Sequence, residues 1–208
     1  MRTVGTLLFP DFELLDVFGP LEMFGALGSE YRLEMVAQAA GPVKSRQGPS
    51  AIADVAIADA RPYDILLIPG GRGTRRGVDN QALIGWIRDH AKRCEVVATV
   101  CTGAALLART GLLDGSKATS NKASFGWVKE QGPDVHWQKH ARWVVDGKYW
   151  TSSGVSAGMD MALALISQLS GADKARQVAV YAEYRWNSDA DDDPFAALYD
   201  GFDSARTS

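Results

Sequence analysis

Residues 96–119, VVATVCTGAALLARTGLLDGSKAT, decide the fold of this chain. An apolar run rich in β-branched residues, Val96–Val100, ends at Cys101, and strong helix formers follow at residues 104–108. This pattern predicts a buried strand that turns sharply into a helix at Cys101. Such a turn lifts the sulfur off the sheet, and the unpaired N–H groups of the first helical turn favour a thiolate. The stretch therefore predicts a nucleophilic cysteine.

A buried cysteine without chemistry is the common alternative, because free cysteine is among the most buried residue types. We expect Cys94, at the start of the same strand, to be such a residue. Cys101 differs because it lies at the strand-to-helix junction with Gly103 two residues further on. This arrangement is the thiol counterpart of a nucleophile elbow.

Two other predicted strands end in loops that belong near Cys101. Residues 4–9, VGTLLF, precede Asp16, and residues 64–68, DILLI, precede the glycine-rich loop Pro69–Gly73. Ligands bind at the carboxyl ends of strands in an open α/β sheet, so Asp16 is a candidate to face Cys101, with a helix N-cap as its alternative role. The glycine-rich loop is a candidate donor of N–H groups to a developing negative charge, although glycines there also form ordinary turns.

The remaining elements alternate between strands and helices. Pro20 favours a helix from about Gly19 to Leu27, preceded by a short turn at residues 12–17. We further expect a strand at residues 31–38, an irregular arm or hairpin at 43–57, a hairpin at 141–152, and helices at 78–92, 121–131, 159–169 and 173–184. The order predicts an α/β sandwich around a mostly parallel sheet with a small β-hairpin.

Composition limits the possible partners. The 208 residues fit one domain, and the 46% apolar and 23% charged residues are typical of soluble globular proteins. A net charge of −3 without a basic stripe argues against a nucleic-acid partner. The densest basic cluster is Arg72, Arg75 and Arg76, which fits either a solvated loop or anion binding.

The start of the chain and its cysteine content predict a cytoplasmic protein. Residues 1–4 run directly into a strand, so we expect no signal peptide, and no apolar run is long enough to predict a membrane span. Two cysteines do not make a disulfide framework. Three histidines without clustered spacing argue against a zinc site, and we expect no metal and no cofactor.

Four motifs together resemble the DJ-1/PfpI superfamily: LLDVFGPLEMF, DILLIPGGRG, VVATVCTGAALLARTGLLDGSKAT and WTSSGVSAGMDMALAL. The resemblance implies a flavodoxin-like three-layer sandwich over residues 1–195, followed by a C-terminal tail at 196–208. From its composition, the acidic segment 188–208 is expected to wrap the surface or fray. The pattern is most similar to the isocyanide (isonitrile) hydratase branch, which implies a small-molecule electrophile as substrate and a homodimer.

Carried over from that branch, Cys101 is the expected nucleophile and Asp16 the general acid and base. Thr102 is expected to support the site through its N–H and hydroxyl groups. The resemblance assigns three glycines to substrate binding: Gly19, Gly70 and Gly71.

Two residues differ from those typical of other branches of the superfamily, which argues against the activities of those branches. Thr102 stands where the protease and amidase branch has histidine, and Asp16 where the glyoxalase branch has glutamate. Asn121 stands where relatives often have histidine, which leaves substrate choice open. Two alternatives remain: a glyoxalase-like conversion of 2-oxoaldehydes by Cys101, and a redox sensor in which Cys101 is oxidised. Some transcriptional regulators share these motifs, but we expect no DNA-binding domain here.

Overall fold

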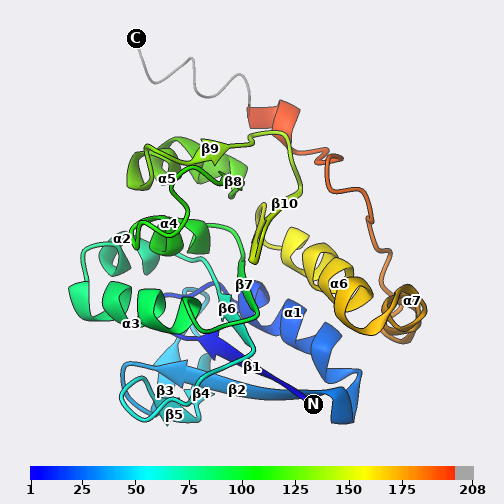
Figure 1. Cartoon of the computed structure of the whole chain (residues 1–208), viewed down its shortest axis with the longest axis horizontal. Coiled ribbons are helices and arrows are strands. Elements are labelled where there is room, and N and C mark those ends of the chain that lie inside the picture. The colour runs from blue at the N-terminus through cyan, green and yellow to red at the C-terminus, as the bar shows by residue number, and fades with distance from the viewer. Residues whose placement is uncertain (200–208) are drawn as a thin grey trace.

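The computed structural model describes residues 1–199, and its centre is a seven-stranded sheet (Figure 1). The strand order is β10-β11-β7-β6-β1-β2-β5, and every neighbouring pair is parallel except β10 with β11. The strands are β1 (Arg2–Leu7), β2 (Tyr31–Ala37), β5 (Val55–Ala56), β6 (Ile65–Ile68), β7 (Val96–Thr99), β10 (Trp143–Asp146) and β11 (Tyr149–Ser152). The predicted mostly parallel sheet is confirmed.

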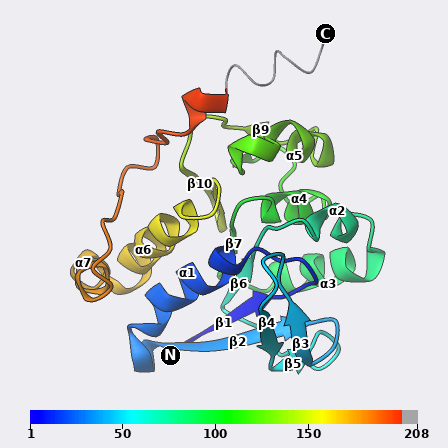
Figure 2. The same cartoon turned by 180° about the vertical axis from the view of Figure 1, so that it is seen from behind.

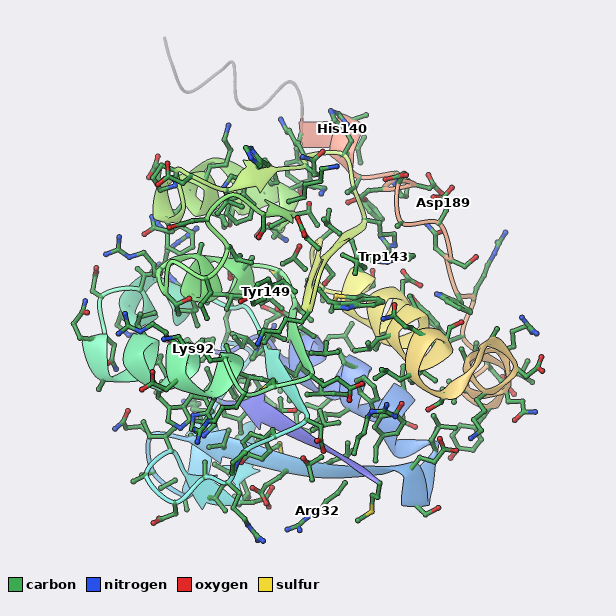
Figure 3. All side chains as sticks on the ribbon, viewed as in Figure 1. Arg32, Lys92, His140, Trp143, Tyr149 and Asp189 are labelled. Carbon is green, nitrogen blue, oxygen red and sulfur yellow. The ribbon has the colours of Figure 1, made fainter. Side chains whose placement is uncertain are left out.

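Helices cover both faces of this sheet, so the protein has three layers (Figures 1 and 2). One face carries α1 (Leu14–Gly25), α6 (Ala157–Ser170) and α7 (Ala172–Tyr181). The other carries α2 (Thr74–Gly77), α3 (Gln81–Ala91) and α4 (Gly103–Ala108), with α5 (Phe125–Gln131) beside α4. Side chains fill the space between the layers (Figure 3), and β6 and β7 are buried along their whole length, as parallel central strands require.

Two small sheets and three 3₁₀ helices complete the described chain. β3 (Gly41–Lys44) and β4 (Ser50–Ala53) form the hairpin expected in the 43–57 arm, and β8 (Lys117–Ala118) pairs with β9 (His136–Trp137). The 3₁₀ helices are η1 (Gly28–Glu30), η2 (Lys122–Ser124) and η3 (Ala196–Tyr199). The proposed domain boundary after residue 195 falls at the start of η3, and tail residues 200–208 lie outside the described residues.

The helix predicted to begin near Gly19 begins instead at Leu14, and Pro20 lies inside it. Proline has no N–H group for the carbonyl four residues earlier, which here is that of Asp16. Burial of the apolar side chains of α1, among them Val17, Leu21 and Phe24, outweighs this loss. Asp16 consequently lies in the first helical turn, and Glu13 occupies the N-cap position without a side-chain cap bond.

A buried cluster of charges holds the chain after α7 against the core. The Arg142 guanidinium contacts the Asp160 carboxylate at 2.5 Å, and Asp160 also accepts hydrogen bonds from the Tyr184 hydroxyl and the Asn187 N–H, both at 3.0 Å. Beside it, the buried Lys122 ammonium lies 3.4 Å from Asp193. Further along, the Arg142 N–H donates to the Ala190 carbonyl at 2.7 Å. These contacts hold residues 184–193 against α6, Lys122 and Arg142.

Removing Asp160 tests this anchor. Asp160→Ala leaves the buried Arg142 guanidinium without its carboxylate, so the free energy of unfolding falls by about 3–5 kcal/mol. Urea denaturation followed by circular dichroism measures the loss. Asp173→Ala, which removes a partner from the exposed Arg176 pair, is the matched control and changes stability by less than about 0.5 kcal/mol. Equal stability of the two variants contradicts the anchoring role.

Candidate active site

Cys101 occupies a sharp turn between β7 and α4, as the sequence predicts. Its φ angle is +57°, in the left-handed region that side chains other than glycine rarely adopt. The Cys101 N–H donates to the Ser153 carbonyl at 3.1 Å, and the Ser120 hydroxyl donates to the Cys101 carbonyl at 2.7 Å. These bonds hold the strained backbone, and the side chain, 7% exposed, faces a pocket. Cys101 therefore forms a nucleophile elbow.

Asp16 lies beside the elbow and is fully buried. Its Oδ2 accepts a hydrogen bond from the Gly70 N–H at 2.8 Å, and its Oδ1 has no hydrogen-bond partner among the described residues. Gly70 fits only because it lacks a Cβ: a Cβ there would lie 2.6 Å from the Thr102 nitrogen and 2.8 Å from both Asp16 Oδ2 and the Cys101 Cβ. The structure thus brings Asp16, Gly70, Cys101 and Thr102 together.

Burial determines the protonation of this group. It raises the pKa of Asp16 to about 8, and the Glu13 carboxylate adds to the rise, whereas the Gly70 N–H and the Cys101 side chain oppose it. Burial also raises the pKa of the Cys101 thiol well above its usual value, and the Asp16 carboxylate raises it further. The thiolate predicted from the helix N-terminus is therefore not the resting form, because loss of solvation outweighs the effect of the nearby amides.

The amides that favour a charged sulfur come from Thr102 and Val155, whose backbone N–H groups lower the pKa of Cys101. The glycine-rich loop is expected from the sequence to supply such donors, but its Gly70 and Gly71 N–H groups bond to other residues than Cys101. The Gly70 N–H bonds Asp16, and the Gly71 N–H donates to the Thr102 hydroxyl at 3.1 Å. These glycines position the acid and Thr102, while Val155 is a donor that the sequence did not indicate.

The structure also shows the surroundings of three other residues that the sequence singled out. The Thr102 hydroxyl also accepts from the Thr74 hydroxyl at 3.1 Å, which fixes its rotamer. Gly19 lies where α1 meets α6, since a Cβ there would be 2.7 Å from the Met159 Cγ, and it does not line the pocket around Cys101. Its predicted role in substrate binding gains no support from this position. Cys94 matches its predicted structural role, because it is buried and its thiol donates to the His90 carbonyl at 3.2 Å.

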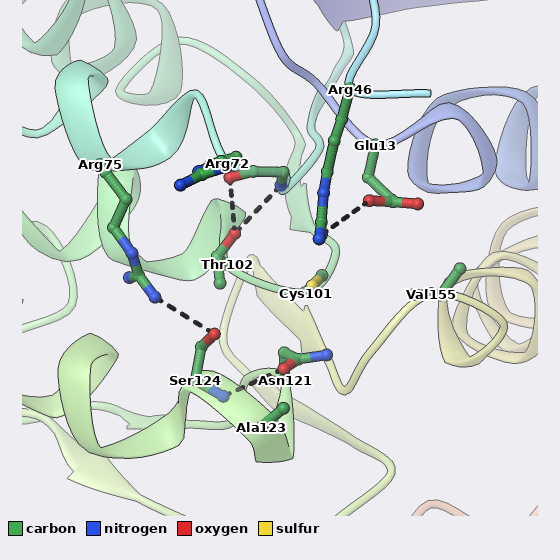
Figure 4. Close-up of a pocket in the computed structure, with 11 residues that line it drawn as sticks. Glu13, Arg46, Arg72, Arg75, Cys101, Thr102, Asn121, Ala123, Ser124 and Val155 are labelled. Atoms are coloured by element: carbon green, nitrogen blue, oxygen red, sulfur yellow. Dashed lines mark hydrogen bonds and ion pairs between the residues drawn. The ribbon is translucent and has the colours of Figure 1, made fainter. Parts of the chain in front are cut away.

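A pocket of about 540 Å³ opens above Cys101 (Figure 4). The hairpin β3–β4 contributes Arg46, because the Arg46 N–H donates to the Phe12 carbonyl at 2.9 Å and ties the hairpin to the loop after β1. On the opposite wall, the Asn121 side chain accepts from the Ser124 N–H at 3.1 Å and so caps η2. The residues lining the pocket are Glu13, Arg46, Gly71, Arg72, Arg75, Cys101, Thr102, Asn121, Ala123, Ser124 and Val155.

Sequence reasoning missed several of these lining residues. Glu13 and Val155 gave no signal of their own, and Arg46 came from an arm to which the sequence assigned no chemistry. Only the tertiary pairing of the arm with the first loop places Arg46 above Cys101 (Figure 4). Within residues 1–199, no three His, Cys, Asp or Glu side chains gather as a candidate metal site. No helix in the same range has the length and apolar character needed to cross a membrane.

Known proteins resemble the chain over nearly this whole fold. A model of the DJ-1/PfpI family matches residues 2–168. An isonitrile hydratase from Pseudomonas putida is 32% identical over 181 residues, which cover 87% of this chain and 78% of that protein. The HTH-type transcriptional regulator CdhR of Pseudomonas aeruginosa is 29% identical over 83% of this chain and 52% of its own length. The crystal structure of a ThiJ/PfpI family protein from Pseudomonas syringae matches with a TM-score of 0.84 and 26% identity, covering 99% of this chain and 86% of that one.

The coupling of the two buried groups can be tested without a substrate. Because the Asp16 carboxylate raises the pKa of Cys101, Asp16→Asn shifts the midpoint of iodoacetamide alkylation at Cys101 to lower pH. Glu13→Gln, which removes a weaker influence on the same thiol, shifts the midpoint less. Peptide mass mapping separates Cys101 from Cys94, whose pKa burial raises to about 11. An unchanged or higher midpoint in Asp16→Asn contradicts the coupling.

Proposed function

The chain belongs to the DJ-1/PfpI family, and we propose that it is a hydratase that adds water to an isocyanide to give an N-substituted formamide. Cys101 is the nucleophile and Asp16 transfers the protons. The observation that carries this proposal is a buried carboxyl group beside a strained cysteine that lines a pocket, because the Asp16 Oδ2 and the Cys101 Cβ each lie 2.8 Å from where a Gly70 Cβ would be. The similarity to an isonitrile hydratase supports the choice of substrate class.

The first half of the reaction forms a thioimidate. With a pKa of about 8, Asp16 is mainly a carboxylic acid at neutral pH and can donate a proton to the terminal carbon of R–N≡C. As that carbon becomes electrophilic, the Cys101 sulfur forms a bond to it and the thiol proton passes to Asp16. The product is R–N=CH–S–Cys101. Asp16 ends this step protonated, as it began.

The second half releases the formamide. Asp16 protonates the imine nitrogen and accepts a proton from the water that attacks the carbon, which gives R–NH–CH(OH)–S–Cys101. The carbon–sulfur bond then breaks, the hydroxyl oxygen becomes the formyl oxygen, and its proton returns to the sulfur through Asp16. One water is consumed and one formamide leaves. The amides of Thr102 and Val155 stabilise the charge that develops on sulfur as this bond breaks.

The raised pKa of Cys101 favours an enzyme over a redox sensor, because oxidation of a thiol follows its thiolate character and exposure. A 2-oxoaldehyde is the nearest rival substrate for the same thiol, so methylglyoxal belongs in the same assay. The homodimer implied by the resemblance and the cytoplasmic location predicted from the sequence both stay predictions.

Substitution of the two central groups tests the proposal. Cys101→Ala removes the nucleophile and lowers formamide production from a simple alkyl isocyanide by at least about a thousandfold. Asp16→Asn removes the transferable proton and lowers kcat by about 10²–10⁴-fold. Mass spectrometry of the formamide measures both. Cys94→Ala is the matched control and keeps the wild-type rate, because Cys94 lies outside the pocket.

Stability distinguishes proton transfer from a structural role of Asp16. The pKa of Asp16 is raised in the folded state, so its contribution to stability is lost as pH rises from about 4 to about 8. Asp16→Asn therefore gains stability relative to wild type across this window while losing turnover. A turnover close to that of the wild type in either Cys101→Ala or Asp16→Asn ends the proposed mechanism.

The pH dependence of turnover gives a separate prediction. If the acid form of Asp16 is required, kcat/KM is flat near neutral pH and falls above about pH 8, where Asp16 ionises. A mechanism that begins with a free thiolate predicts the opposite slope, because the thiol ionises at still higher pH. Initial rates between pH 6 and pH 10 with a neutral isocyanide decide between them. A rising profile contradicts the role of Asp16 as the first acid.

A further inference from the structure

The pocket above Cys101 carries a positive charge that the proposed chemistry does not use. Three arginines line it, Arg46, Arg72 and Arg75, against a single carboxylate, Glu13. The chain as a whole has a net charge of −3, so this cluster runs against the overall balance. Among the described lining residues only Ala123 and Val155 have aliphatic side chains, whereas a simple alkyl isocyanide calls for an apolar wall.

Internal pairing accounts for only one of the three arginines. Arg46 lies 3.7 Å from the Glu13 carboxylate, and Figure 4 shows this ion pair beside Cys101. Neither Arg72 nor Arg75 forms an ion pair with a carboxylate of residues 1–199. Arg72 and Arg75 therefore line the pocket without a direct ion pair among the described residues, and the more distant Glu130 carboxylate acts on Arg75 only through space.

Arg75 is held in place for a ligand. Its guanidinium stacks on the Trp127 ring, 3.3 Å from the centroid. It also donates to the Ser124 hydroxyl at 3.2 Å, as Figure 4 shows. Partial burial lowers the pKa of Arg75, and a negative charge on Cys101 raises it, so the two groups share one electrostatic environment. A fixed guanidinium loses little side-chain entropy when it binds a carboxylate through two parallel hydrogen bonds.

All three arginines of this loop are exposed to solvent, and they differ in whether they line the pocket. The Arg76 guanidinium contacts Asp11 at 2.8 Å and does not line the pocket. Arg72 and Arg75 come from the same short segment and do line it. Of these exposed arginines, only Arg76 has an ion-pair partner among the described residues, whereas Arg72 and Arg75 line the pocket.

Building on the proposed function, we infer that the substrate is an isocyanide that carries a carboxylate, which Arg72 and Arg75 bind while its terminal carbon meets Cys101. A pocket of about 540 Å³ accommodates a molecule of this size. The carboxylate supplies the counter-charge that the pocket lacks, and it orients the isocyano group at the other end of the molecule towards the elbow.

Matched substrate pairs test the inference. Isocyanoacetate, 3-isocyanopropanoate and 4-isocyanobutanoate are each compared with the corresponding methyl ester, which keeps the isocyano group and the chain length but replaces the negative charge by a methyl group. The wild-type protein is expected to show a kcat/KM at least about tenfold higher for the best carboxylate than for its ester. Arg75→Gln and Arg72→Gln each lower this ratio by about tenfold, and Arg76→Gln leaves it unchanged. A wild-type preference for the esters, or an equal ratio in all four proteins, overturns the inference.

Alkylation separates failure of this inference from failure of the proposed function. Iodoacetate and iodoacetamide have nearly the same size and differ in charge, and their rates at Cys101 are divided by their rates with a free thiol. The normalised iodoacetate/iodoacetamide ratio exceeds one in the wild type and falls in Arg75→Gln and Arg72→Gln, but not in Arg76→Gln. If neither the isocyano carboxylates nor their methyl esters are hydrated, the proposed function is wrong. The normalised iodoacetate/iodoacetamide ratio then decides by itself whether the pocket binds carboxylates. A normalised ratio of one or below shows that it does not.

Discussion

The left-handed backbone at Cys101 is the constraint on which the site depends. A φ angle of +57° at a residue other than glycine costs about 1–3 kcal/mol and persists only where the surroundings impose it. Hydrogen bonds with Ser120 and Ser153 impose it here, and they come from the segments after β8 and β11. The backbone conformation of the elbow therefore depends on segments that follow strands of two different sheets. Its effect is to hold the sulfur against the Asp16 carboxyl, with no room at Gly70 for a side chain between them.

Burial gives this contact its chemical character. For both Asp16 and Cys101, desolvation raises the pKa by more than the amide hydrogen bonds lower it, so both groups retain their protons in the resting protein. A carboxylic acid beside a neutral thiol suits a substrate that must be protonated on carbon as sulfur attacks it. The arginines of the pocket lie on its exposed walls, whereas Asp16 and Cys101 are buried, so the end of the site at these two residues is dry and the opposite end is polar.

The sequence predicted the parts of the site that lie at strand ends, and missed those brought in by tertiary contacts. Cys101, Asp16 and Gly70 follow β7, β1 and β6, and parallel strands place such residues at one edge of a sheet. Arg46 reaches the pocket only because its hairpin folds back onto Phe12, which no local pattern encodes. The start of α1 was misplaced because Pro20 predicts a helix terminus when the burial of its neighbours is unknown. β5 and β9, two residues each, are too short to show a periodicity.

The ion pair between Lys122 and Asp193 has a consequence for biosynthesis. Lys122 follows Asn121 directly, so the wall of the pocket opposite Arg46 rests on a contact with a segment translated long after Cys101. Until Asp193 has been translated, the buried Lys122 ammonium lacks this counter-charge and has only its hydrogen bonds to the Thr119 hydroxyl and to the Ser120 and Ala141 carbonyls. The side of the pocket next to Asn121 is therefore completed by a carboxylate that the ribosome adds well after Cys101.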